Sequence, residues 1–86
     1  MRLQGKVAVV TGAGGGFGEG IARLFAAQGA KVVVADLDGD AAARVAGEIG
    51  ATPLQGDVSQ GADVQAMVDA AVKAHGGLDI VVNNAG

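Results

Sequence analysis

The stretch Thr11-Gly12-Ala13-Gly14-Gly15-Gly16-Phe17-Gly18 decides how this chain of 86 residues folds. It follows the apolar run Val7 to Val10, and an unbroken run of this kind is typical of a parallel strand that is buried on both faces. After the glycines, apolar residues recur on one face of a helix that we predict from Glu19 to Gln28, and Gly29 is a natural stop for it. The stretch is therefore predicted to be a glycine-rich loop, from Thr11 to Gly18, that leads from a buried strand into a helix.

The rest of the chain repeats this alternation of strand and helix. Strands are expected at Lys31 to Ala35, Thr52 to Gly56 and Ile80 to Val82, and the second of these is the weakest because it contains a proline. Helices are expected from about Asp40 to Ile49 and from about Gly61 to His75. Strands that alternate with helices of this length imply a parallel sheet with right-handed crossovers. We therefore predict an α/β fold in the order β-α-β-α-β-α-β, with one domain over residues 1–86.

The helix that ends at His75 has the clearest apolar stripe in the sequence, and this stripe should face the sheet. Its members are Val64, Met67, Val68, Ala71 and Val72. Ser59 is expected to cap the N-terminus of this helix, and His75 suits the negative end of the helix dipole.

The composition excludes several classes of function. Cysteine is absent and histidine occurs once, which excludes a disulfide scaffold, a thiolate metal site and a multi-histidine metal site. The net charge of -3 and the isoelectric point near 4.7 argue against nucleic-acid binding. No apolar run approaches the roughly 20 residues that cross a bilayer, and no secretory leader is visible at the start. We expect a cytoplasmic protein that binds no metal, nucleic acid or membrane.

The glycine-rich loop precedes a helix, so an anion can dock at the free N–H groups and the positive dipole end of that helix. The sequence contains neither G-x-G-x-x-G nor a Walker A motif, but it fits T-G-x-x-x-G-x-G. A turn that merely closes the strand–helix unit is the alternative. Five glycines in the seven positions from Gly12 to Gly18 exceed what such a turn needs, which favours a site for a phosphate group.

Asp36 follows the second predicted strand, close to the spacing of about 20 residues at which an acidic side chain binds the ribose of a dinucleotide. A carboxylate at this position accepts hydrogen bonds from ribose hydroxyls and repels a 2′-phosphate. No Arg or Lys adjoins Asp36 or stands inside the loop, so NAD is favoured over NADP. Two alternatives stay open, namely that Asp36 is a solvated loop residue or that it is a helix cap. Asp38 is a competitor for the ribose role but is better explained as the cap of the second helix.

Two further motifs complete the pattern, because Asp57-Val58 follows the third predicted strand and Asn83-Asn84-Ala85-Gly86 follows the fourth. In this order, the four motifs resemble those of the short-chain dehydrogenase/reductase family. The resemblance covers the whole chain and implies a Rossmann-like half domain whose four-stranded parallel sheet has the order 3-2-1-4.

The resemblance also implies a set of cofactor-binding residues. These are Gly12, Gly15, Gly16, Phe17, Gly18, Asp36, Leu37, Asp57, Val58, Asn83, Ala85 and Gly86. Those of the loop would hold the pyrophosphate, with Phe17 acting through its backbone N–H. The pair after the second strand would hold the adenosine ribose, the pair after the third would hold the adenine, and those after the fourth would lie along the nicotinamide and its ribose. For the two asparagines, a structural role that ties strand ends together is equally open.

The chain also departs from the family, whose members are longer and use a Tyr-x-x-x-Lys pair with a Ser beyond N-N-A-G. Tyrosine is absent here and Ser59 is the only serine, so we expect no catalytic residue. We interpret the chain as the N-terminal half of such an enzyme, truncated or engineered, which binds NAD or another ADP-containing nucleotide without transferring hydride. Two alternatives remain, a protein that has the fold alone and binds no cofactor, and one half of a split NAD-dependent oxidoreductase.

The fourth predicted strand, Ile80 to Val82, would lie at an edge of the sheet in this strand order. It is apolar on both faces and carries neither the charges nor the prolines that usually protect edges. We expect two copies of the chain to pair along it as an antiparallel homodimer.

Overall fold

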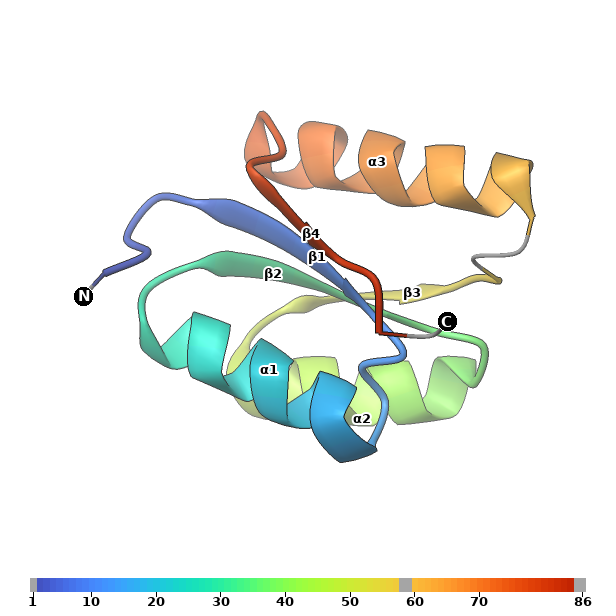
Figure 1. The fold of residues 1–86 in the computed structure, drawn as a ribbon, viewed down its shortest axis with the longest axis horizontal. Coiled ribbons are helices and arrows are strands. Elements are labelled where there is room, and N and C mark those ends of the chain that lie inside the picture. Colours follow the sequence, from blue (N-terminus) through green and yellow to red (C-terminus); the bar gives the residue numbers. More distant parts are fainter. Residues whose placement is uncertain (1, 58–59, 85–86) are drawn as a thin grey trace.

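The computed structural model describes residues 2–57 and 60–84 and shows four parallel strands with three helices (Figure 1). In chain order the elements are β1 (Val7–Thr11), α1 (Gly16–Ala27), β2 (Lys31–Asp36), α2 (Gly39–Ile49), β3 (Thr52–Gln55), α3 (Gly61–His75) and β4 (Ile80–Val82). The strands lie in the order β3-β2-β1-β4, as the sequence predicts. Pro53 is tolerated in β3 because that strand lies at an edge of the sheet.

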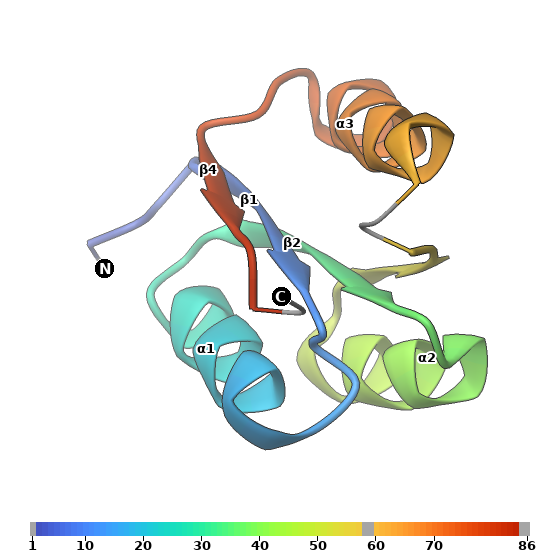
Figure 2. The same ribbon diagram turned by 45° about the vertical axis from the view of Figure 1, so that its right-hand side comes forward.

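Helices cover both faces of the sheet, with α1 and α2 on one face and α3 on the other (Figure 2). The central strands β1 and β2 supply both cores because side chains alternate between the faces of a strand. Val10 and Val34 pack with Val45 on the side of α1 and α2. Val9 and Val33 pack with Met67 and Ala71 of α3 on the other side. This arrangement explains the unbroken valine runs of the two strands.

Helix α1 begins earlier than predicted, at Gly16 rather than Glu19, and it ends at Ala27. The connection from β1 is therefore only Gly12 to Gly15, and the predicted loop from Thr11 to Gly18 was too long at both ends. Glycine's low helix propensity caused this error. The first helical turn tolerates glycine here because packing against the loop requires it, as described below.

The ends of the other helices follow local signals. Asp38 caps α2, since its Oδ1 accepts the N–H of Ala41 at 3.1 Å, and Gly50 closes the helix in the left-handed region at φ 71°. Gln60 takes the N-cap position of α3 and makes no side-chain capping bond, and the predicted cap, Ser59, lies outside the described residues. None of the helices in the described segments is long and apolar enough to cross a membrane.

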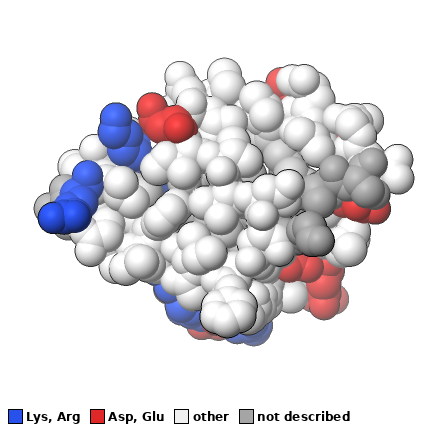
Figure 3. Space-filling model, viewed as in Figure 1, with Lys and Arg blue, Asp and Glu red and all other residues white. Residues whose placement is uncertain are grey.

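The apolar stripe of α3 is only partly buried, contrary to the prediction. Met67 and Ala71 are buried, but Val64 and Val72 are exposed, Val72 to 48%. The cause is the position of the helix, because α3 packs on β1 and β2 and its far side lies beside β4, the short last strand of the sheet. On the face seen in Figure 3, charged side chains lie mainly at the margins and uncharged ones across the middle.

An apolar groove of about 140 Å³ lies between α3 and β4, and we call it the α3–β4 groove. Its lining residues are Val9, Thr11, Val64, Met67, Val68, Leu78, Val81 and Asn83. Val81 is 60% exposed at its rim. The predicted edge is therefore present, and Val81 faces solvent, whereas Val82 packs against the core on the side of α1 and α2.

Candidate functional site

The carboxyl ends of all four strands lie at one end of the sheet, on the right in Figure 1, beside the N-terminus of α1. In an open parallel sheet this is the end at which ligands bind. Asp36 ends β2 here, and Asp57 and Asn83 follow β3 and β4. The topology thus brings together motifs that are far apart in the sequence.

The loop between β1 and α1 has the backbone that its glycines permit. Gly12 and Gly16 have φ values of +62° and +56°, in the left-handed region that side chains disfavour. A Cβ atom built on Gly15 or Gly16 would meet no atom within 4 Å, so this side of the loop is open. Gly15 is the N-cap of α1 and provides no side-chain cap. The first N–H groups of a helix have no partner within the helix, so this uncapped terminus can receive an anion.

Gly18 is required by the close approach of α1 to the start of the loop. A Cβ atom at Gly18 would overlap the carbonyl group of Gly12 and lie 2.8 Å from the Nδ2 atom of Asn84. The side chain of the neighbouring Phe17 is 88% exposed and points away from the core. Its predicted contribution through the backbone N–H remains a prediction.

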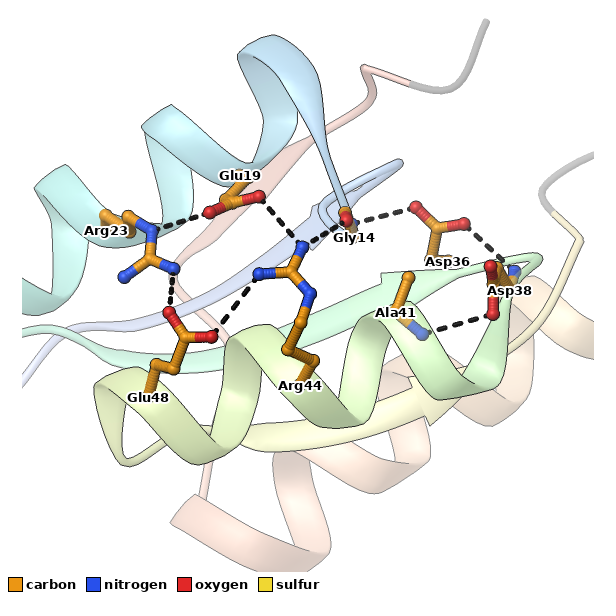
Figure 4. A network of polar contacts seen from close by, with 8 residues as sticks. All are labelled: Gly14, Glu19, Arg23, Asp36, Asp38, Ala41, Arg44 and Glu48. Atoms are coloured by element: carbon orange, nitrogen blue, oxygen red, sulfur yellow. Dashed lines mark hydrogen bonds and ion pairs between the residues drawn. The ribbon is translucent and has the colours of Figure 1, made fainter.

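The carboxylate of Asp36 is held by two backbone groups (Figure 4). Its Oδ2 atom accepts the N–H of Gly14 at 2.8 Å, and its Oδ1 atom accepts the N–H of Asp38 at 2.9 Å. Asp36 is thus the last residue of β2, and the cap of α2 is Asp38. Each carboxylate oxygen can accept more than one hydrogen bond, so the group retains capacity for a ligand hydroxyl.

A cavity of about 140 Å³ lies beside Asp36, and we call it the β2–β3 cavity. Its lining residues are Thr11, Gly12, Ala35, Asp36, Leu37, Gly56, Asp57 and Met67. Four predicted site residues therefore meet in it, namely Gly12, Asp36, Leu37 and Asp57. The backbone N–H of Asp57 donates to Oδ2 of Asp63 at 2.9 Å, which fixes the start of this segment against α3.

The asparagines after β4 tie strand ends together. The Thr11 hydroxyl accepts the N–H of Asn84 at 3.0 Å and lies 3.3 Å from Oδ1 of Asn83. The Nδ2 atom of Asn84 donates to the carbonyl oxygen of Gly12 at 3.4 Å. The structural role left open from the sequence is therefore present, and cofactor contact by Asn83 remains a prediction. The predicted site residues Val58, Ala85 and Gly86 lie outside the described residues.

Arg44 is a neighbour of the loop that the sequence analysis missed. Its Nη2 atom donates to the carbonyl oxygen of Gly14 at 3.1 Å, although 30 residues separate the two. No Arg or Lys adjoins Asp36 or stands inside the loop along the chain, as the sequence analysis noted, but the fold brings Arg44 to the loop from α2. Met67 was also missed as a lining residue of the β2–β3 cavity. Its sequence signal was only that of a core position on α3.

Four charged side chains link α1 to α2 next to the loop, and we call them the α1–α2 network (Figure 4). Arg23 contacts Glu19 and Glu48, and Arg44 contacts the same two carboxylates. Hydrogen bonds from Arg23 and Arg44 hold the pKa of Glu19 below its ordinary value, and those from the same arginines lower the pKa of Glu48. The pKa of Arg44 is raised, chiefly by its hydrogen bond to Glu19. All four groups therefore stay charged at neutral pH.

The sheet order, the glycine loop and the acidic end of β2 place the molecule in the class of Rossmann-like α/β proteins. Within that class, the chain belongs to the short chain dehydrogenase family, whose family model matches residues 6–86. This match confirms the resemblance inferred from the four motifs.

Several relatives align with nearly the whole chain. The mitochondrial borneol dehydrogenase of Lavandula x intermedia is 48% identical over 85 residues, which cover 99% of this chain and 33% of that protein. The 7alpha-hydroxysteroid dehydrogenase of Escherichia coli is 44% identical over 91 residues, which cover 100% of this chain and 36% of that protein. The chain thus spans about a third of the length of these relatives.

Solved structures give the same result. The 3-ketoacyl-(acyl-carrier-protein) reductase of Brucella melitensis, complexed with NADH, superposes with a TM-score of 0.88 at 54% identity, over 92% of this chain and 33% of that one. A short chain dehydrogenase/reductase of Burkholderia phymatum, in complex with NAD, has a TM-score of 0.88 at 44% identity, over 94% of this chain and 31% of that one. The α/β fold and the strand order are therefore those of solved oxidoreductases.

Proposed function

We propose that the chain binds NAD through its adenosine half, at the β2–β3 cavity and the N-terminus of α1. The observation that carries this proposal is the meeting of Asp36, Asp57 and the glycine loop around one cavity. The nucleotides NADH and NAD in two solved relatives support it. Those structures concern whole proteins, of which this chain matches about a third.

The shape and the hydrogen-bonding groups of the site fit an ADP-ribosyl group. The open side of Gly15 and Gly16 admits a pyrophosphate to the uncapped helix terminus. In the proposal, Asp36 accepts hydrogen bonds from the ribose hydroxyls, with Leu37 beside it, and Asp57 receives the adenine amino group. The other predicted contacts follow the family: Gly12, Phe17, Gly18, Val58, Asn83, Ala85 and Gly86.

We further propose that NAD is preferred over NADP. The fixed carboxylate of Asp36 would repel a 2′-phosphate placed beside it. Arg44 lies nearby, but it belongs to the α1–α2 network, in which two arginines face two glutamates. The network therefore adds no net positive charge to offset the repulsion.

The nicotinamide of a bound NAD would supply a hydride acceptor. The relatives are oxidoreductases, but the 86 residues contain no tyrosine to serve as the family's acid and base. We therefore propose binding without hydride transfer for these residues by themselves. The cytoplasmic location expected from the sequence stays a prediction.

A titration tests the binding proposal. ADP-ribose and NAD should each shift the backbone amide signals of the loop, with dissociation constants nearer millimolar than micromolar, about -4 to -6 kcal/mol. ADP-ribose should bind about as well as NAD because the adenosine half carries the contacts. The absence of a saturable response to several millimolar of either nucleotide would contradict the proposal and favour a protein that has the fold alone.

We also propose that a second copy of the chain covers the β4 edge as a homodimer. The strand is terminal in the sheet, and Val81 is exposed beside the apolar α3–β4 groove. An antiparallel pairing centred on Val81 places Asp79 of each copy opposite residue 83 of the other, so the two Asp79 carboxylates are kept apart. A two-fold axis then buries both edges and both grooves in one self-complementary interface.

A further inference from the structure

The loop residue Gly14 is held from three directions (Figure 4). Its N–H donates to Asp36 at 2.8 Å, and its carbonyl oxygen accepts from Arg44 at 3.1 Å. A Cβ atom at Gly14 would lie 2.7 Å from the Cβ atom of Ala41 on α2, so only glycine allows this close packing. The middle of the loop therefore rests on the end of β2 and on the outer surface of α2.

Arg44 also contacts the first turn of α1. Its Nη2 atom lies 3.2 Å from Oε1 of Glu19, and its Nη1 atom lies 3.3 Å from Oε2 of Glu48. One guanidinium group thus contacts both the middle of the loop and the helix that follows it. The two carboxylates orient this group, since its planar array of donors favours such a fixed geometry.

We propose that Arg44 is a positioning residue that holds the glycine loop in the conformation that accepts the nucleotide phosphates. This inference rests on the proposed function but concerns a residue that need not touch the nucleotide. Glycine-rich backbone loses much conformational entropy when it is ordered. A contact that orders the loop before the ligand arrives removes that loss from the free energy of binding.

Arg23 provides a matched control within the same network. It contacts the same two glutamates as Arg44. It lies on α1, one turn beyond Glu19, and away from Gly14 (Figure 4). Its exposed ion pairs resemble those of Arg44, and exposed pairs contribute little to stability. Arg23→Gln and Arg44→Gln should therefore have similar melting temperatures and differ in their effect on the loop.

The test compares the two variants by nucleotide titration. Arg44→Gln should weaken the binding of ADP-ribose about five- to tenfold, in line with the net contribution of one typical intramolecular hydrogen bond, whereas Arg23→Gln should weaken it less than about twofold. The ratio between NADP and NAD affinities should stay unchanged in Arg44→Gln. Equal losses in both variants, or no loss in Arg44→Gln, would overturn the inference. A selective loss of NADP binding would also overturn it, because Arg44 would then be a phosphate contact.

A second measurement needs no ligand and separates this inference from the proposed function. The amide proton of Gly14 should exchange faster with solvent in Arg44→Gln, and its chemical shift should move, while Arg23→Gln leaves both as in the unaltered chain. If no nucleotide binds to the unaltered chain, the proposed function fails and this amide signal still decides whether Arg44 holds the loop. An unchanged Gly14 amide in Arg44→Gln would refute the positioning role.

Discussion

Helices cover the two faces of the sheet to different extents. On the face of α1 and α2, the side chains of Val10, Val34 and Val45 are completely buried, and the α1–α2 network closes the outer surface. On the face of α3, by contrast, Val72 and Val81 face solvent beside the α3–β4 groove. The first face positions the loop and Asp36, so the candidate site depends on the better packed side. The second face is the one on which we propose that a second copy of the chain packs.

Substitution of Gly18 should have the largest effect, because it acts where α1 meets the loop. Gly18→Ala forces a Cβ atom into the Gly12 carbonyl. It should lower the free energy of unfolding by about 3 kcal/mol, at the upper end of overpacking effects, and it should also abolish nucleotide binding. Gly20→Ala is the control on the same helix, since a Cβ atom there meets nothing within 4 Å. It should stabilise the chain by about 0.5–1 kcal/mol. Urea unfolding measures both, and similar values for the two would contradict the packing described for the loop.

Truncation of one valine on each face tests the comparison directly. Val45→Ala should cost about 2–3 kcal/mol because it leaves a cavity in the packed face, whereas Val72→Ala should cost less than about 1 kcal/mol. The measurement is urea unfolding at a protein concentration low enough to keep the chain monomeric. An equal cost at both positions would mean that the α3 face is covered in the monomer, which would break the comparison.

Replacement of Asp36 tests the part of the site that the well-packed face holds in place. Asp36→Ala should weaken NAD binding by about 1.5–3 kcal/mol, because a charged hydrogen-bond acceptor is lost. It should also reduce the difference in affinity between NAD and NADP, because the carboxylate no longer repels the 2′-phosphate. Asp38→Ala is the control, since it removes the cap of α2 and should lower stability by about 1 kcal/mol while the cofactor preference stays. Equal affinity of the unaltered chain for NAD and NADP would remove the basis of this assignment.

A charge on β4 tests the exposed face. Val81→Lys should convert a dimer into a monomer of 8.3 kDa, because a lysine at the pairing edge opposes strand addition. Sedimentation at high micromolar concentration gives the mass. If the unaltered chain is already a monomer, the proposed dimer is excluded. If the dimer survives the substitution, its interface must lie elsewhere.

The smallest expected effect is the acid sensitivity of the α1–α2 network. The pKa of Glu19 and of Glu48 is lowered in the folded state, so their contribution is present above the ordinary glutamate pKa of about 4.3 and is lost as the pH falls through the lowered values. In Glu48→Gln, the free energy of unfolding should therefore decrease less between about pH 5 and pH 3 than in the unaltered chain. The effect should be modest because the side chain of Glu48 is exposed. Urea midpoints across this range measure it, and parallel curves for the two proteins would contradict the pKa assignment.

The sequence predicted those parts of the structure that depend on local patterns. Valine runs indicate buried strands, and Asp38 and Gly50 mark the ends of α2, because these signals act within a few residues. The start of α1 was missed because the propensity of glycine was weighed without the packing of Gly18. Periodicity identified the apolar face of α3 but carried no information on whether another element covers Val64 and Val72.

The candidate site was predictable in its chemistry and less so in its geometry. Asp36 and the loop follow from motif and spacing, and the fold brings them within hydrogen-bonding distance. The contact of Arg44 with Gly14 depends on how α2 packs beside the loop. A pattern read along the chain contains no signal for it beyond the i,i+4 spacing of Arg44 and Glu48.

The pairing of β1 with β4 has a consequence for biosynthesis. Val7 and Asp79, which meet where the two strands start, are 72 residues apart, whereas β2 follows β1 closely. A ribosome releases the N-terminal part first, so β1, β2 and β3 can assemble with α1 and α2 while one edge of β1 still has no neighbour. During that interval a valine-rich strand presents open backbone groups to other nascent chains. The pairing of β4 with β1 ends this exposure of β1 and moves the open edge of the sheet to β4, where Val81 faces solvent.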